Sequence, residues 1–200
     1  MKILQRFQAM APVLLEENAS VFLDAVDRLE ADSDDFINSD EAKRYNVEDQ
    51  TYAGTEDRGF LMGLFLGIAQ DLAYTLWIDW SGEEGQGEFE TWVDARLHAF
   101  SDHFDYAVVD DWEETLDWDT LERGEYIESK FNRVGQYLNS KGFALIFFED
   151  GGDAYYPFLL RQNAWASLPD TVRTVAEPCE FPYPRLRSHG EKFTDDENPV

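Results

Sequence analysis

The stretch FALIFFEDGGDAYYPFLLR, residues 143–161, decides the fold. It contains two short runs, 143–148 and 154–161, that are apolar on both faces, and the segment EDGGD separates them. Apolar runs of this length bounded by Asp and Gly predict a buried antiparallel β-hairpin. Pro157 has no backbone N–H, so we expect the second strand to lie at a sheet edge or to be bulged at this residue.

Outside the hairpin the hydrophobic spacing changes several times along the chain. Residues 73–80, AYTLWIDW, alternate with a period of two and predict a further strand. Helical spacing covers residues 2–31, in two pieces separated at Pro12, and residues 55–72, where Thr55 is the expected cap. It returns at residues 89–100 and 163–175. Between these two lies a further predicted helix, which a capping box of Asp119 and Glu122 begins and Gly142 ends.

These elements predict an α+β fold in which several helices, mainly on one face, pack a small antiparallel sheet that includes the C-terminal hairpin. A single domain is expected over residues 1–187, followed by a polar tail over residues 188–200.

Glycine recurs every four residues in the predicted 55–72 helix, at Gly59, Gly63 and Gly67. Residues with this spacing share one helix face, so we expect another backbone to approach that face closely inside the core. A membrane-dimer motif would need a longer apolar span. The longest apolar run, 60–69, is well below the roughly 20 residues that cross a bilayer.

The chain is strongly acidic, with 42 acidic and 16 basic residues and a formal net charge of −26. Such a potential repels nucleic-acid phosphates and anionic lipids, so we expect no direct nucleic-acid or membrane binding and infer a basic partner. Acidity that serves only solubility is the alternative. The single cysteine, Cys179, excludes an intrachain disulfide, and polar residues interrupt the N-terminal apolar segment, so a cytoplasmic location is expected.

Signatures of nucleophilic catalysis and phosphate binding are absent from the sequence, which has neither G-x-S-x-G nor G-x-x-x-x-G-K. His98 and His103 are five residues apart and would diverge by about 140° if both lay on one helix. Cys179 lies among acids and prolines, which disfavour a catalytic thiolate. We therefore predict a protein that is not an enzyme and has no cofactor.

Carboxylates at the hairpin turn leave one enzymatic alternative open. Glu149, Asp150 and Asp153, with Asp79 from the neighbouring strand, offer oxygen ligands for Mg²⁺ or Ca²⁺ and predict a metal-dependent hydrolase. The spacing lacks the ligand cadence of a calcium loop, and a hairpin turn itself favours Asp and Gly. We favour the turn over the metal site.

Negative charge is densest in residues 102–128, which contain eleven acids and one base. The core of this segment is DDWEETLDWD, in which two tryptophans lie among the acids. Large aromatics ringed by charge are typical of a protein-binding surface. The predicted contact residues are Asp110, Asp111, Trp112, Glu113, Glu114, Asp117 and Trp118. The alternative is a solvated helix face whose tryptophans turn inward.

The hairpin GFALIFFEDGGDAYYPFLL, residues 142–160, resembles the strand, Asp/Gly turn and strand of the SUKH superfamily, in which a similar DGGGD hairpin occurs. It also resembles hairpins in small acidic bacterial domains of unknown function. Many SUKH members are bacterial immunity proteins, so the resemblance implies an intracellular protein that binds and neutralises a toxin. The expected tryptophan and Leu-Pro motifs of that superfamily are not evident here.

Charge and resemblance together predict an immunity or inhibitor protein whose partner is a basic protein toxin. A nuclease fits this description because its active cleft is basic. A DNA-mimic regulator that binds a host DNA-binding protein is a further alternative.

Overall fold

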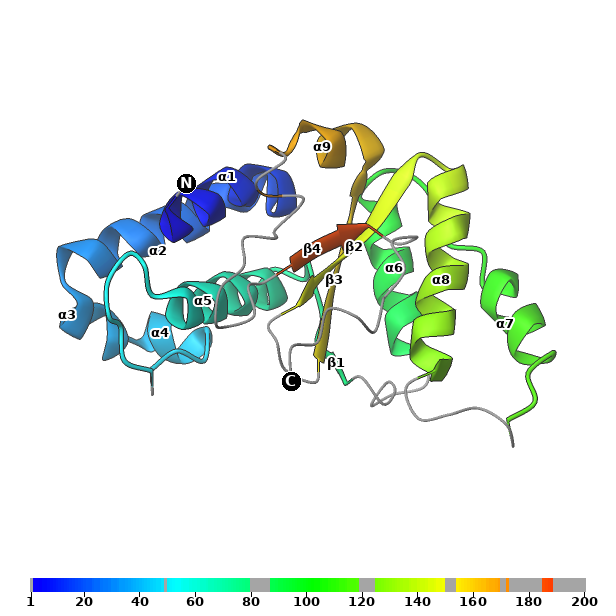
Figure 1. Cartoon of the computed structure of the whole chain (residues 1–200), viewed down its shortest axis with the longest axis horizontal. Helices are drawn as coiled ribbons and strands as arrows, with labels where there is room; N and C mark the ends of the chain where they lie inside the picture. Colours follow the sequence, from blue (N-terminus) through cyan, green and yellow to red (C-terminus); the bar gives the residue numbers. More distant parts are fainter. Residues whose placement is uncertain are drawn as a thin grey trace.

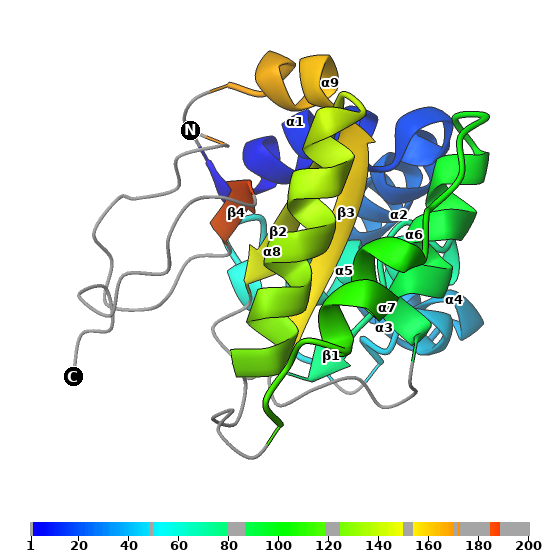
Figure 2. The ribbon, with the colours of Figure 1, turned by 90° about the vertical axis from the view of Figure 1, so that its right-hand side faces the viewer.

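The computed structural model describes residues 2–48, 50–79, 87–118, 125–149, 154–169, 172 and 185–188, with the backbone alone at 149 and 185–188. A four-stranded antiparallel sheet in the order β1-β3-β2-β4 lies between two layers of helices (Figures 1 and 2). Its strands are β1 (Ile78–Asp79), β2 (Phe143–Glu149), β3 (Ala154–Arg161) and β4 (Arg185–Ser188). The α+β class predicted from the sequence is confirmed.

The N-terminal half of the chain forms the layer on one side of the sheet (Figure 1). It contains α1 (Ile3–Leu14), η1 (Glu16–Asn18), α2 (Ala19–Ala31), α3 (Ser33–Ile37), α4 (Asp40–Arg44) and α5 (Arg58–Asp71). Aromatic rings from α1, α2, α5 and β2 fill its core; the Phe22 and Phe65 rings meet edge to face at 5.2 Å, and Phe7 contacts both of them and Phe148.

The second layer consists of α6 (Glu88–His98), α7 (Ala107–Glu113) and α8 (Glu125–Ser140), and α9 (Gln162–Ser167) follows β3. In this layer Phe131 of α8 lies at the centre, 5.0 Å from the Phe89 ring and 4.5 Å from the Phe147 ring. Figure 2 shows α8 in front of the sheet, with α7 along its outer side.

The expectation that helices cover mainly one face of the sheet is wrong, because both faces are covered. Side chains alternate across a strand, and Ala144, Ile146 and Phe148 of β2 enter the first core, whereas Phe143, Leu145 and Phe147 enter the second. A strand that is apolar on both faces requires a layer on each side to keep it from water.

The predicted hairpin is present, since β2 and β3 pair from Phe143↔Arg161 to Glu149↔Tyr155, and the turn residues 150–153 lie outside the described residues. Pro157 lies in a strand with neighbours on both sides, yet β1 pairs only with residues 154 and 155. At Pro157 the β1 side is occupied by Thr75, whose hydroxyl donates to the Pro157 carbonyl at 2.7 Å. The strand is thus locally an edge where the proline requires one.

Several predicted helix boundaries differ from those observed. Helix α1 continues through Pro12 to Leu14, because a proline in the last turn removes only one helical hydrogen bond. The cap of α5 is Asp57, whose carboxylate accepts the Phe60 N–H at 3.1 Å, so the assignment of Thr55 is wrong.

At the C-terminal end, α9 stops at Ser167 before Pro169, which is earlier than predicted. Strand β4, which pairs with β2, was not predicted, and it ends at Ser188, the residue at which the polar tail was expected to begin. The predicted capping box of Asp119 and Glu122 falls outside the described residues, while the C-terminal stop at Gly142 is confirmed by its φ of 83°.

The predicted close approach at the α5 glycines occurs at Gly67. A Cβ atom there would lie 2.3 Å from the Tyr45 carbonyl oxygen, so backbone meets backbone. A Cβ atom at Gly63 would lie 3.0 Å from its nearest neighbour, the Gln50 side-chain nitrogen. A Cβ atom at Gly59 would have no neighbour among the described residues closer than 3.8 Å. Within the described residues no helix is both long and apolar enough to cross a membrane.

Candidate functional site

The acidic segment predicted to bind a partner is centred on α7, a short helix on the outer side of α8 (Figures 1 and 2). Its buried residue is Val109, which belongs to the second core. The α8 residue Arg133 also holds it, because its Nε donates to the Val108 carbonyl at 3.1 Å. Helices this short depend on tertiary contacts, so these attachments determine where the acids of α7 point.

The inner side of α7 is attached to a buried cation. Lys130 of α8 is 1% exposed, and its Nζ lies 2.8 Å from Glu90 Oε1 of α6 and 3.5 Å from Glu113 Oε1 of α7. Tyr126 donates its hydroxyl to Glu113 and stacks on Trp112 with 5.8 Å between ring centroids. One ammonium group thus joins all three helices of this layer.

The same arrangement changes the pKa of the Tyr126 phenol. Burial, followed by the hydrogen bond to the Glu113 carboxylate, raises the pKa of the Tyr126 phenol above its usual value. The Lys130 ammonium, 4.9 Å from the centre of the Tyr126 ring, acts in the opposite direction. The phenol therefore stays protonated and remains a hydrogen-bond donor to Glu113 in the folded protein.

The outer side of α7 combines acids with exposed aromatic rings. Tyr106, Asp110 and Glu114 are spaced four residues apart and linked by backbone hydrogen bonds of 3.0 and 3.1 Å, so they form one row along the helix. Tyr106, at the start of the row, is 42% exposed; Trp118, which follows α7 in the chain, is 56% exposed and packs part of its ring on Tyr126 of α8, with 5.1 Å between ring centroids. We call this surface the α7 face; its residues are Tyr106, Asp110, Asp111, Glu114, Asp117 and Trp118.

The structure divides the predicted contact residues into two groups. Asp110, Asp111, Glu114, Asp117 and Trp118 are exposed on the α7 face, whereas Trp112 and Glu113 are partly buried and point towards α8. Trp112 therefore packs against the second core, whereas Trp118 contacts Tyr126 of α8 on one side and stays 56% exposed. Tyr106 was missed because it lies outside the densest run of acids, although its spacing from Asp110 is visible in the sequence.

The carboxylates of the hydrolase alternative lie near the hairpin end of the sheet. Asp79 of β1 pairs with Ala154, and Glu149, the last residue of β2, pairs with Tyr155 on the opposite side of β3. The Glu149 side chain, Asp150 and Asp153 lie outside the described residues, so this metal site stays a prediction.

Sequence reasoning missed a cluster of Asp94, His98 and His103. The expected divergence of the two histidines is wrong, because α6 ends at His98 and the chain reverses before His103. His98 Nε2 and His103 Nδ1 lie 2.6 Å apart, and Asp94 Oδ2 is 3.8 Å from His98 Nε2. One ligand atom from each of the three residues lies within 4.8 Å of the others.

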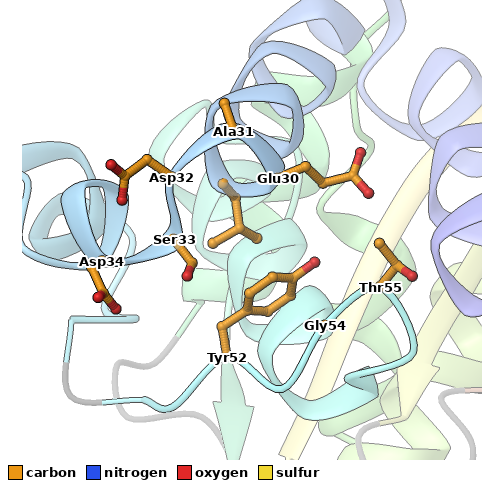
Figure 3. Close-up of a pocket in the computed structure, with 9 residues that line it drawn as sticks. Glu30, Ala31, Asp32, Ser33, Asp34, Tyr52, Gly54 and Thr55 are labelled. Carbon is orange, nitrogen blue, oxygen red and sulfur yellow. The ribbon is translucent and has the colours of Figure 1, made fainter.

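A hollow of about 450 Å³ lies between the end of α2, the start of α3 and residues 52–55 (Figure 3). Its acidic residues are Glu30, Asp32 and Asp34, and the Tyr52 hydroxyl points between Glu30 and Thr55 (Figure 3). Burial and then the nearby charge of Glu30 raise the pKa of Tyr52. The nine lining residues include no base, so the hollow suits a cationic group, and it lies at the opposite end of the molecule from α7 (Figure 1).

The chain belongs to the family described as Domain of unknown function (DUF6630), whose model matches residues 6–176. No curated protein and no solved structure matches it. The family match runs from α1 past α9 and includes the hairpin. The likeness of that hairpin to the SUKH superfamily stays a prediction.

Proposed function

We propose that this protein binds and neutralises a basic protein toxin through the α7 face, as an immunity or inhibitor protein, and that the toxin is a nuclease. The observation that carries the proposal is the 56% exposure of Trp118, together with the exposed acids of the helix that precedes it. Tryptophan exposed to this extent loses much water-accessible area when a partner covers it, and aromatic residues contribute most of the binding free energy in many interfaces.

Charge supports a basic partner over a neutral one. Asp110, Asp111 and Glu114 make no ion pair with any residue in the part of the chain that the structure describes. Together with the net charge of −26, these acids attract a basic surface from a distance and accelerate the encounter. A nuclease presents such a surface, because its cleft binds phosphates.

The inner attachments of α7 favour binding without rearrangement. Lys130, Tyr126 and Arg133 hold the helix on α8, so its outer side chains are presented from a fixed backbone. A surface that is ordered before it binds loses less conformational entropy on association. The same face would serve a DNA-mimic regulator, whose partner would be a DNA-binding protein of the host in place of a toxin.

Binding to the protein encoded immediately upstream, measured by biolayer interferometry, tests the proposal. The variant Asp110→Lys, Asp111→Lys and Glu114→Lys reverses three charges on the α7 face. The matched control Asp24→Lys, Asp27→Lys and Asp35→Lys makes the same change in net charge at exposed positions of α2 and α3 that do not line the acidic hollow. Trp118→Ala removes the exposed ring.

We expect the α7 variant to associate at least about tenfold more slowly than the control, because local complementarity acts in addition to net charge. Trp118→Ala should weaken the affinity by about 30-fold or more, mainly through faster dissociation. Equal effects of the two charge-reversal variants would show that only net charge matters. Equal effects, or no effect of Trp118→Ala, would refute the α7 face as the contact surface.

A further inference from the structure

The Asp94, His98 and His103 cluster lies at the end of α6, apart from the α7 face. Asp94 and His98 are one helical turn apart on α6, so both side chains emerge on the same side of the helix. His103 returns to this side from the following turn, and its ring meets the His98 ring edge to face, with 4.5 Å between centroids. Two imidazole nitrogens and one carboxylate oxygen therefore lie within 4.8 Å of one another.

The turn that returns His103 is defined by backbone hydrogen bonds. The Asp102 N–H donates to the Leu97 carbonyl and the Ser101 N–H to the His98 carbonyl, both at 3.0 Å, which is the Schellman pattern. Ser101 takes the left-handed position of that motif, with a φ of 59°. A non-glycine residue adopts this conformation at some cost in free energy, which the surrounding contacts must offset.

Hydrogen bonds from neighbouring residues and from other elements hold Asp94 and the His103 backbone in place. The Phe104 N–H donates to Asp94 Oδ1 at 2.8 Å, which orients the carboxylate and leaves Oδ2 towards His98. The His103 carbonyl accepts from Lys141 Nζ at 3.1 Å and from the Tyr137 hydroxyl at 3.3 Å. Both the carboxylate and the backbone of His103 are thus held, while the two imidazole rings are exposed to solvent.

We propose that Asp94, His98 and His103 bind a divalent transition-metal ion of the zinc class. Imidazole nitrogens with one carboxylate oxygen are a donor set that suits zinc, iron and nickel, and they do not suit magnesium or calcium, which prefer oxygen alone. Three protein ligands leave at least one coordination position for water. His98 donates through Nε2 and His103 through Nδ1, and Asp94 donates through Oδ2.

The observed distances need only small changes to accommodate the ion. Zinc ligands bound at about 2.0–2.2 Å in tetrahedral geometry are about 3.3–3.6 Å from one another. The two imidazole nitrogens must therefore separate from 2.6 Å, and the Asp94 oxygen must approach from 3.8 Å. Exposed histidine rings make such shifts by rotation about their side-chain bonds. The negative net charge of the chain further favours a cation.

Calorimetric titration of the full-length protein with Zn²⁺ tests the site, in buffer of about 0.15 M ionic strength to screen weak binding to surface acids. Mg²⁺ serves as the comparison ion. Co²⁺ titration supplies a spectroscopic readout, because its visible absorption reports coordination by nitrogen. The variants are His98→Ala with His103→Ala, and Asp94→Asn, which retains an oxygen to accept the Phe104 N–H. His189→Ala, at the third histidine, is the matched control.

We expect one Zn²⁺ per chain, a rise in melting temperature with Zn²⁺, and no comparable effect of Mg²⁺. The double histidine variant should bind Zn²⁺ at least tenfold more weakly and lose the Co²⁺ absorption. Asp94→Asn should also bind more weakly, and His189→Ala should bind like the wild type. Unchanged Zn²⁺ binding in the double histidine variant, or no saturable binding by the wild type, would overturn the proposal. None of these outcomes bears on partner binding by the α7 face.

Discussion

Replacement of Lys130 by methionine tests the inference that the inner side of α7 is structural. Methionine retains an unbranched side chain and a high helix propensity, so the substitution removes mainly the ammonium group. In the wild type this group lies 2.8 Å from Glu90 Oε1 and 3.5 Å from Glu113 Oε1, with Lys130 1% and Glu90 4% exposed. The variant removes the cation shared by the Glu90 carboxylate, whose side chain is 5% exposed, and the Glu113 carboxylate, whose side chain is 23% exposed.

The expected loss of stability follows from that burial. Removal of one partner from a buried ion pair costs about 3–5 kcal/mol, because the remaining charge keeps its desolvation penalty without its counter-ion. Lys130→Met should therefore lose about this much free energy of unfolding. Glu90→Gln removes one of the two carboxylate charges that pair with Lys130. The double variant Lys130→Met, Glu90→Gln should therefore lose about 1–3 kcal/mol less free energy of unfolding than the sum of the losses in the two single variants.

Urea unfolding followed by circular dichroism and tryptophan fluorescence measures these values from the midpoint and the slope. Lys43→Met is the matched control, because Lys43 and Asp40 form an ion pair whose side chains are 59% and 101% exposed. Removal of that pair should change stability by less than about 0.5 kcal/mol. If Lys130→Met costs no more than the control at unchanged slope, the reasoning about the buried cation is refuted.

Two further substitutions have expected outcomes of defined sign. Gly67→Ala should destabilise the protein by about 1–3 kcal/mol, because the new Cβ would lie 2.3 Å from the Tyr45 carbonyl oxygen. Gly59→Ala should stabilise it by up to about 1 kcal/mol. The opposite order of urea midpoints would contradict the packing of α5. Because folding raises the pKa of Tyr126, the unfolded chain loses this proton first, at about pH 10, and the stability of the protein should fall as the pH rises further. The urea midpoint of Tyr126→Phe should therefore fall less steeply than that of the wild type between about pH 9 and 11. Equal slopes of the two proteins would count against the role of the phenol.

Local patterns in the sequence predicted the strands of the hairpin and most helices. They did not predict the arrangement of layers, although the relevant signal was present. The run at residues 143–148 is apolar on both faces, and this requires helices on both sides of the sheet, yet the prediction assigned them mainly to one. Strand β4 escaped prediction because its residues, RLRS, owe their conformation to pairing with β2 and carry no strong strand pattern of their own.

In the candidate sites, the placement of single residues could not be predicted either, because it depends on contacts with other elements. The density of acids around Trp112 and Trp118 indicated α7, but not how far each tryptophan is exposed, because both rings pack on Tyr126 of another helix. The histidine cluster depends on Ser101 in a left-handed conformation, which a serine does not signal. Spacing along an assumed continuous helix therefore separated two side chains that the turn brings together.

In the described part of the fold, no basic residue pairs with the α7-face acids Asp110 and Glu114, whereas several basic residues pair with acids elsewhere. Several bases join elements of the fold: Arg96 to Glu16 at 3.4 Å, Arg44 to Asp71 at 2.6 Å, and Lys130 to two helices. Asp110 and Glu114 are one helical turn apart and make no such contact with the described residues, so their repulsion opposes folding slightly. Neutral residues at these positions would fold at least as well. Stability therefore does not account for this row of acids, whereas the proposed binding of a basic partner would.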